Sequence, residues 1–67
     1  MEPDMTDLTY ILVTNAFSGA RKLVTCHKTR GFERLNKERN TWGVASARFV
    51  PEFEAAELMS MGVPVRK

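Results

Sequence analysis

Two β-rich segments separated by six residues constrain the fold of this chain most strongly. Segment 8–14 reads LTYILVT, and its β-branched and aromatic side chains favour pleated backbone. Segment 21–27 reads RKLVTCH and also predicts a strand. Asn15 and the Ser18-Gly19 pair supply turn-forming residues between the two segments. The sequence therefore predicts an antiparallel hairpin whose first strand is apolar enough for burial on both faces.

A third strand and a C-terminal helix complete the expected fold. Residues 42–50 alternate between two faces, one of which carries mainly small side chains. Pro51 suits the first position of a helix, and Gly62 suits the residue just after its end. The inward stripe of this helix follows the i, i+3, i+4, i+7 rule and consists of Ala55, Leu58, Met59 and Gly62. We expect a small α+β domain, and a small all-α domain is the alternative.

The size of the chain limits what it can contain. Its 67 residues predict one domain, 1–67, in which segment 1–7 is a loose acidic lead-in. A core of this size supplies only about 3–5 kcal/mol, so self-association is a natural source of further stability. One cysteine excludes an internal disulfide, and one cysteine with one histidine falls short of a four-ligand zinc site. We therefore expect no metal and no cofactor, with a homodimer as one expected assembly.

The N-terminal segment bears on location. It carries acidic residues where a secretory signal carries positive charge, and the apolar run at 10–13 is too short for a signal core or a membrane span. The single cysteine agrees with a reducing compartment. The sequence thus predicts a soluble intracellular, cytoplasmic protein with no membrane partner.

Positive charge is concentrated in the middle of the chain. Segment 21–48 holds eight basic residues against two glutamates, a local net charge of +6, whereas the whole chain has +2. Three of these basic residues belong to the predicted strands. The other five lie in residues 28–41, which we call the basic connector. Phe32 and Leu35 are the only large apolar side chains between its ends. A helix and an ordered loop are therefore equal alternatives for this connector.

No arrangement of catalytic residues is recognisable. Cys26 and His27 are the conventional nucleophile and base, but adjacent residues of a strand point to opposite faces, which prevents a Cys–His dyad. The four glycines are isolated, so the chain has no glycine-rich phosphate loop. We expect no enzymatic activity and no small-molecule substrate.

The basic connector is the main candidate for function. Clustered cations neutralise phosphates, while aromatic rings and arginine planes stack on unpaired bases. Glu33 and Glu38 lie inside the cluster, where they would repel a phosphate backbone. We expect a small non-catalytic binding protein that docks this connector on an anionic macromolecular surface, most simply nucleic acid. The candidate binding residues are His27, Lys28, Arg30, Arg34, Lys37, Arg39 and Trp42.

A small regulator or inhibitor of a protein partner is the alternative function. It would bind an enzyme, a transcription component or another acidic protein surface through aromatic and basic contacts. Phe53 and Met61 lie off the inward stripe of the last helix and form the candidate protein interface. Burial of Phe53 under a loop and burial of Trp42 in the third strand are the structural alternatives at these two positions.

Overall fold

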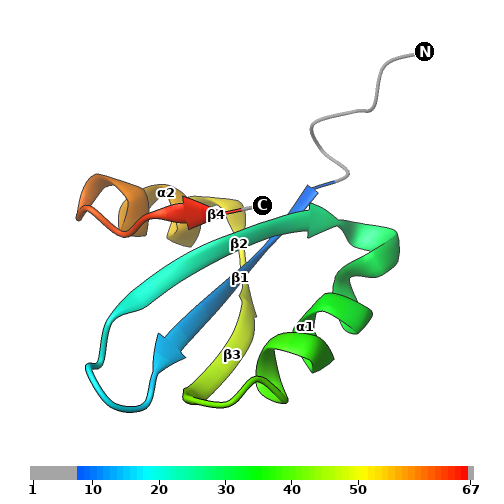
Figure 1. Ribbon diagram of the computed structural model, residues 1–67. Coiled ribbons are helices and arrows are strands. Elements are labelled where there is room, and N and C mark those ends of the chain that lie inside the picture. The colour runs from blue at the N-terminus through cyan, green and yellow to red at the C-terminus, as the bar shows by residue number, and fades with distance from the viewer. Residues whose placement is uncertain (1–7, 67) are drawn as a thin grey trace.

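The computed structural model describes residues 8–66, which form a four-stranded mixed sheet with a helix on each face (Figure 1). The elements follow in the order β1 (Leu8–Asn15), β2 (Arg21–His27), the 3-10 turn η2 (Lys28–Arg30), α1 (Gly31–Arg39), β3 (Val44–Val50), α2 (Glu52–Ser60) and β4 (Val65–Arg66). The α+β prediction is confirmed, and the all-α alternative is wrong. The expected loose lead-in, residues 1–7, lies outside the described residues.

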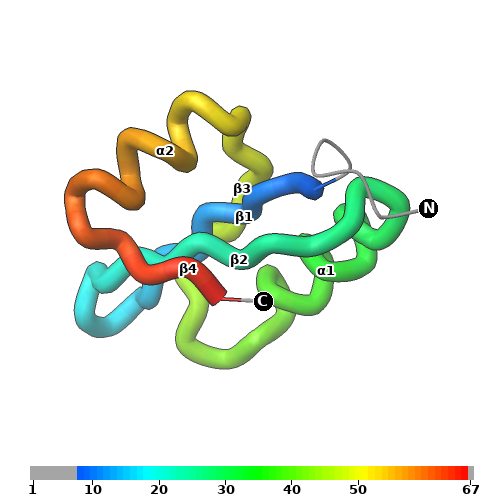
Figure 2. The backbone as a smooth tube through the Cα atoms, turned by 90° about the horizontal axis from the view of Figure 1, so that it is seen from above, coloured from blue at the N-terminus to red at the C-terminus, as the bar shows by residue number. Residues whose placement is uncertain are grey.

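The strand order β3-β1-β2-β4 explains why the two helices cover opposite faces. β1 runs antiparallel to both β2 and β3, so β2 and β3 are parallel and are joined by a crossover through α1. β4 runs parallel to β2, so α2 forms a second crossover that returns across the sheet in the opposite direction. Two crossovers of the same hand that run in opposite directions place their helices on opposite faces. Figure 2 shows α1 and α2 on the two sides of the strands.

The predicted hairpin is present, with β1 and β2 paired from Leu8↔His27 to Thr14↔Arg21. Its turn is closed by the Asn15 side chain, whose Oδ1 accepts hydrogen bonds from the backbone N–H groups of Phe17 and Ser18 at 2.8 and 3.0 Å. Gly19 follows with a φ of +73°, a conformation that glycine adopts without a steric penalty. The turn-forming residues identified in the sequence therefore form the turn of the hairpin.

β1 is buried on both faces, as the sequence predicted. Leu12 joins a core cluster beneath α2, whereas Ile11 and Val13 join a second cluster beneath α1. The α2 cluster contains Leu12, Leu23, Val50, Ala55, Leu58 and Val63. The α1 cluster contains Ile11, Val13, Val24, Leu35 and Ala47. The sheet therefore separates two small cores, and β1 supplies side chains to both.

α2 ends where the sequence predicted, in a Schellman motif. The Val63 N–H donates to the Leu58 carbonyl at 3.0 Å, and the Gly62 N–H donates to the Met59 carbonyl at 3.0 Å. Gly62 has a φ of +93°, and Val63 packs with Leu58 in the α2 cluster. Met59 was placed in the inward stripe, but its side chain is largely exposed, and Val63 fills the core position instead. Pro51 was predicted at the first helical position, but it is the N-cap, and the helix begins one residue later, at Glu52.

The third strand is shorter than predicted, and the fourth was missed. β3 begins at Val44 because Gly43, with a φ of +90°, interrupts the extended backbone. Trp42 therefore lies in the loop before β3 and not in the core, so the structural alternative considered for it is wrong. β4 has two residues, and the Leu23 N–H donates to the Pro64 carbonyl at its start. A two-residue strand leaves no periodic pattern in the sequence.

Gly62→Ala tests the Schellman end of α2. No atom lies within 4 Å of a Cβ built at Gly62, so the substitution acts through backbone conformation alone. We expect a loss of about 1–2 kcal/mol in the free energy of unfolding, measured by urea denaturation. Gly62→Asn is the matched control and should lose less, because asparagine enters the left-handed region more readily. Equal stability of Gly62→Ala and wild type would contradict this account.

Candidate functional site

The basic connector contains the helix α1, which decides between the two alternatives left by the sequence. Leu35 anchors the helix in the core cluster beneath it. Gly31 lets the start of the helix approach the sheet closely, because a Cβ at this position would lie 3.3 Å from the Phe49 ring and 3.4 Å from the Thr9 methyl group. Phe32 is exposed and contacts Phe49 edge to face, with ring centroids 5.5 Å apart. The core contact of Leu35 and the close approach of Gly31 and Phe32 to the sheet thus hold a helix that has little apolar surface of its own.

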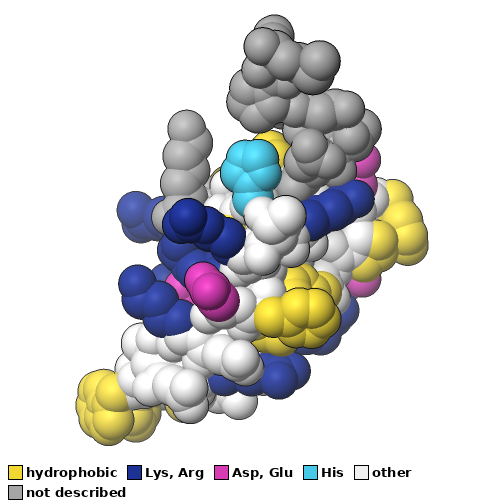
Figure 3. Space-filling view, turned by 90° about the vertical axis from the view of Figure 1, so that its right-hand side faces the viewer, with side chains coloured by type: hydrophobic (Ala, Val, Ile, Leu, Met, Phe, Trp, Pro, Cys, Tyr) yellow, Lys and Arg dark blue, Asp and Glu magenta, His cyan; other side chains and the backbone are white. Residues whose placement is uncertain are grey.

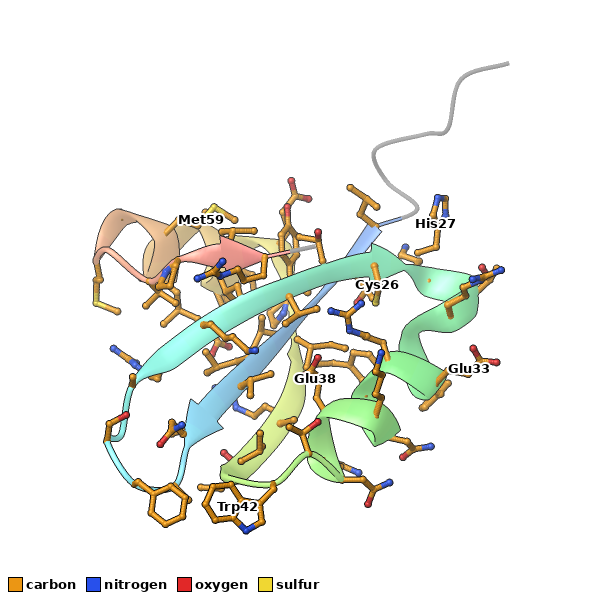
Figure 4. The ribbon with its side chains drawn as sticks, in the orientation of Figure 1. Cys26, His27, Glu33, Glu38, Trp42 and Met59 are labelled. Carbon is orange, nitrogen blue, oxygen red and sulfur yellow. The ribbon has the colours of Figure 1, made fainter. Side chains whose placement is uncertain are left out.

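Glu38 is turned toward the sheet and paired with two cations. Only 7% of the residue is exposed, and its carboxylate accepts a hydrogen bond from Arg34 Nε at 3.1 Å. Lys22 Nζ from β2 lies 3.9 Å from the other carboxylate oxygen. Figure 4 shows Glu38 directed inward from α1 and Glu33 directed away from the sheet. Glu38 is therefore a structural group that joins α1 to β2, and Glu33 is the acidic residue left on the outer surface of the helix.

Arg39 is also engaged within the fold. Its Nε donates to the Ala47 carbonyl at 3.2 Å. The Asn15 N–H donates to the Ala20 carbonyl on the β2 side. Because N–H directions alternate along a strand, the backbone groups of Val13 also point toward β2. Val13 lies opposite Ala47, so the backbone groups of Ala47 point away from β1, along the free edge of β3. Arg39 covers the middle of that edge.

Four of the predicted binding residues surround one open pocket, which we call the cationic pocket. It has a volume of about 630 Å³ and lies between the end of β2 and the outer side of α1. Its lining residues are Cys26, His27, Thr29, Arg30, Glu33, Arg34 and Lys37. In Figure 3, basic side chains lie on both sides of the histidine, with a carboxylate among them. The fold thus brings together His27, Arg30, Arg34 and Lys37.

The remaining predicted residues lie elsewhere. Lys28 borders a separate shallow pocket with Phe32 and Phe49. Trp42 is 86% exposed at the opposite end of α1, where its ring centroid lies 5.1 Å from that of Phe17 (Figure 4). The predicted binding residues are therefore divided among four places: the cationic pocket, the Arg39 contact with the edge of β3, the pocket beside Lys28, and the aromatic pair of Trp42 and Phe17.

The two candidate interface residues on α2 are exposed. Phe53 is 74% exposed, so its burial under a loop is wrong, and Met61 is also exposed. Both lie on the helix that covers the other face of the sheet from α1. They are therefore separate from the cationic pocket.

Sequence reasoning missed a second pocket beside Trp42. It has a volume of about 320 Å³, and its cations come from β2 and β4: Arg21, Lys22 and Arg66. Among the described residues that line it, none carries a carboxylate. Arg21 and Lys22 had been assigned to the sheet alone, and β4, which carries Arg66, was not predicted. The pocket could have been anticipated in part from the hairpin register, which sets Arg21 opposite Thr14, next to the turn.

Cys26 provides a chemical probe of the cationic pocket. Its side chain packs against the α1 cluster, and Figure 4 shows it on the α1 side of β2, with His27 on the other side. Burial raises the pKa of the Cys26 thiol above its usual value, and the nearby positive charge of Arg34 opposes that rise. At neutral pH the thiolate fraction is therefore smaller than that of a free thiol.

Within residues 8–66, no helix is long and apolar enough to span a membrane, and no group of three or more His, Cys, Asp and Glu side chains is placed to hold a metal ion. Comparison with models of known families, with curated proteins and with solved structures gave no match. The candidate function therefore depends on the geometry of the surface alone.

Arg39→Ala tests the protection of the β3 edge. Removing the guanidinium leaves an unpaired carbonyl in the middle of a seven-residue edge strand, and such edges pair with other chains. We expect stronger self-association than in the wild type, measured by sedimentation velocity at several protein concentrations. Lys37→Ala removes the same charge from the same helix and should leave association unchanged. The edge account fails if the two variants associate equally.

Arg34→Ala tests the electrostatic environment of Cys26. Removing the positive charge that lowers the thiol pKa should raise that pKa further, so alkylation at neutral pH becomes slower. The measurement is the rate of iodoacetamide modification as a function of pH, whose midpoint should move upward. Lys37→Ala, which removes a charge elsewhere along the pocket, is the control. A faster reaction in Arg34→Ala would contradict the assignment.

Proposed function

We propose that this protein is a small non-catalytic binding protein that docks the cationic pocket on an anionic macromolecular surface, most simply nucleic acid. The observation that carries the proposal is the convergence of His27, Arg30, Arg34 and Lys37 on one open pocket. Clustered cations of this kind neutralise the phosphates of a nucleic-acid backbone. Glu38, which the sequence placed among them as a source of repulsion, is turned into the fold.

The distribution of charge over the two faces supports this orientation. The three glutamates of α2, which are Glu52, Glu54 and Glu57, belong to the face opposite the cationic pocket. Arg48 of β3 is bonded to Glu54 at 2.6 Å, which neutralises its charge on that face. An anionic partner is therefore attracted to the α1 face and repelled from the α2 face, which fixes how the protein approaches it.

The side-chain chemistry of the pocket suits phosphate. Arg30 presents a planar guanidinium group, which binds phosphate oxygens in a bidentate manner, and Arg34, whose Nε donates to Glu38, adds positive charge beside it. Lys37 adds a compact point charge on the next turn of the helix. Glu33 on the pocket rim disfavours phosphates that approach from its side. The pocket thus favours an elongated partner that runs past Arg30, Arg34 and Lys37.

The free thiol of Cys26 agrees with a reducing compartment, and we place the protein in the cytoplasm for this reason.

The direct test is the salt dependence of nucleic-acid binding, measured by fluorescence anisotropy with a labelled oligonucleotide. Each phosphate contact contributes about 0.9 to the log–log slope of affinity against salt on a duplex. Lys37→Ala should weaken binding and reduce the slope by about one contact. Arg48→Ala removes the same charge on the other face and should change neither quantity. Absence of binding at low salt, or an equal loss in both variants, overturns the proposal.

Binding to a protein partner through α2 is the second candidate function. Phe53 and Met61 are both exposed, Phe53 in the first turn of α2 and Met61 at its C-cap. Exposed aromatic residues of this kind commonly anchor interfaces, including those of homodimers. Recovery of a stoichiometric protein from lysate after nuclease treatment, lost in Phe53→Ala, would favour this function over the first.

A further inference from the structure

An aromatic pair at the far end of α1 is held in the open. Phe17, in the turn of the hairpin, is 72% exposed, and Trp42, in the loop before β3, is 86% exposed. Their ring centroids lie 5.1 Å apart with an interplanar angle of 38°. Two large apolar side chains from segments distant in sequence therefore meet outside both core clusters.

The pair is fixed by the backbone around it. The Ala16 N–H donates to the Gly43 carbonyl at 2.8 Å, which ties the hairpin turn to the loop that carries Trp42. The Asn15 side chain accepts a hydrogen bond from the Phe17 N–H. Gly43 lies against Phe17, since a Cβ built at Gly43 would sit 3.5 Å from the ring. A surface fixed in this way loses little conformational entropy when a ligand binds.

The chemistry beside the pair is cationic. Trp42 borders the second pocket, which also contains Arg21, Lys22 and Arg66. A flat aromatic surface next to arginines is the arrangement that binds single-stranded nucleic acid, because the ring stacks on a base while the cations hold the adjacent phosphates. Charge complementarity therefore favours a polyanion with exposed planar groups over an apolar protein segment.

The second pocket and the cationic pocket lie along the same strand. Lys22 borders the second pocket, and Cys26 and His27 border the cationic pocket. The strand from Arg21 to His27 spans about 20 Å at the usual rise per residue. Between the two pockets, Lys22 and Arg34 both pair with Glu38. Lys22 shares the α1 side of β2 with Val24, and Arg66 lies beside Val24 in the register, so cations on this face connect the two pockets over a length that suits several nucleotides.

We propose that Phe17 and Trp42 form a stacking platform for an unpaired base, so that the protein selects single-stranded over double-stranded nucleic acid. This inference rests on the proposed function and specifies its ligand. Bases within a duplex stack on each other and leave no face for the platform, whereas an unpaired base offers its whole π surface. The nucleic-acid strand then runs from the platform past Lys22 to the cationic pocket.

Trp42 is the only tryptophan of the chain, so its intrinsic fluorescence reports on the platform alone. We expect quenching when oligothymidylate is added and none when a long blunt-ended duplex is added at equal phosphate concentration. Trp42→Ala should weaken binding of labelled oligothymidylate about 5- to 150-fold, the range measured for loss of one stacked base. Trp42→Phe keeps an aromatic ring and should retain most of the affinity. Phe53→Ala removes a similarly exposed ring from the other face and should change nothing.

The outcomes separate this inference from the function on which it rests. If neither nucleic acid binds at low salt, the proposed function fails and the platform fails with it. If both bind in a salt-dependent way but with equal affinity and without quenching, the function stands and the platform is overturned. The platform is also overturned if Trp42→Ala binds oligothymidylate as tightly as wild type, or if Trp42 instead proves necessary for capture of a nuclease-resistant protein partner. Circular dichroism of each variant confirms that the fold is retained.

Discussion

The burial of β1 on both faces is the constraint on which the rest of the structure depends. One residue after another along this strand enters alternate core clusters, with Leu12 beneath α2 and its neighbours Ile11 and Val13 beneath α1. β1 is also hydrogen-bonded to strands on both sides. A chain of 67 residues thus builds two thin cores around a single shared strand, and neither helix has a core without it. The candidate functional surface depends on this arrangement because α1 carries Arg34 and Lys37 of the cationic pocket and is anchored to the sheet by Leu35.

Where the sequence carried a local signal, the fold was predictable. The hairpin followed from the β-branched residues before and after the turn that begins at Asn15. The end of α2 followed from Gly62, because glycine is favoured where the backbone becomes left-handed after a helix. The functions of the individual charges were not predictable in this way. Glu38 and Arg39 are adjacent in the same helix, yet Glu38 pairs with Lys22 of β2 as well as with Arg34, whereas Arg39 bonds to the Ala47 carbonyl of β3. Only the tertiary structure brings these two strands to the helix.

The same limit applies to the candidate site. The sequence identified His27, Arg30, Arg34 and Lys37 only as residues close together along the chain, and the structure sets them around one pocket. Nothing in the local sequence indicated that Trp42 would meet Phe17, because the contact depends on a hydrogen bond between two turns 27 residues apart, from Ala16 to Gly43. Residues assigned only to strand ends, such as Arg21, acquire a place beside that pair through the hairpin register. Contacts between turns are set by sheet topology, which leaves no pattern in a short sequence.

The contact of Arg39 with β3 links ligand binding to the solubility of the chain. α1 holds the pocket cations on one side and covers the open backbone of β3 on the other, through the bond to Ala47. Local opening of this helix would therefore remove the binding site and expose an aggregation-prone strand in the same event. A ligand that binds only the closed form lowers the population of the open form by mass action. Under the proposed function, ligand-bound protein is both the active species and the species best protected against polymerisation, and depletion of the ligand favours loss of the protein by assembly of its exposed edges.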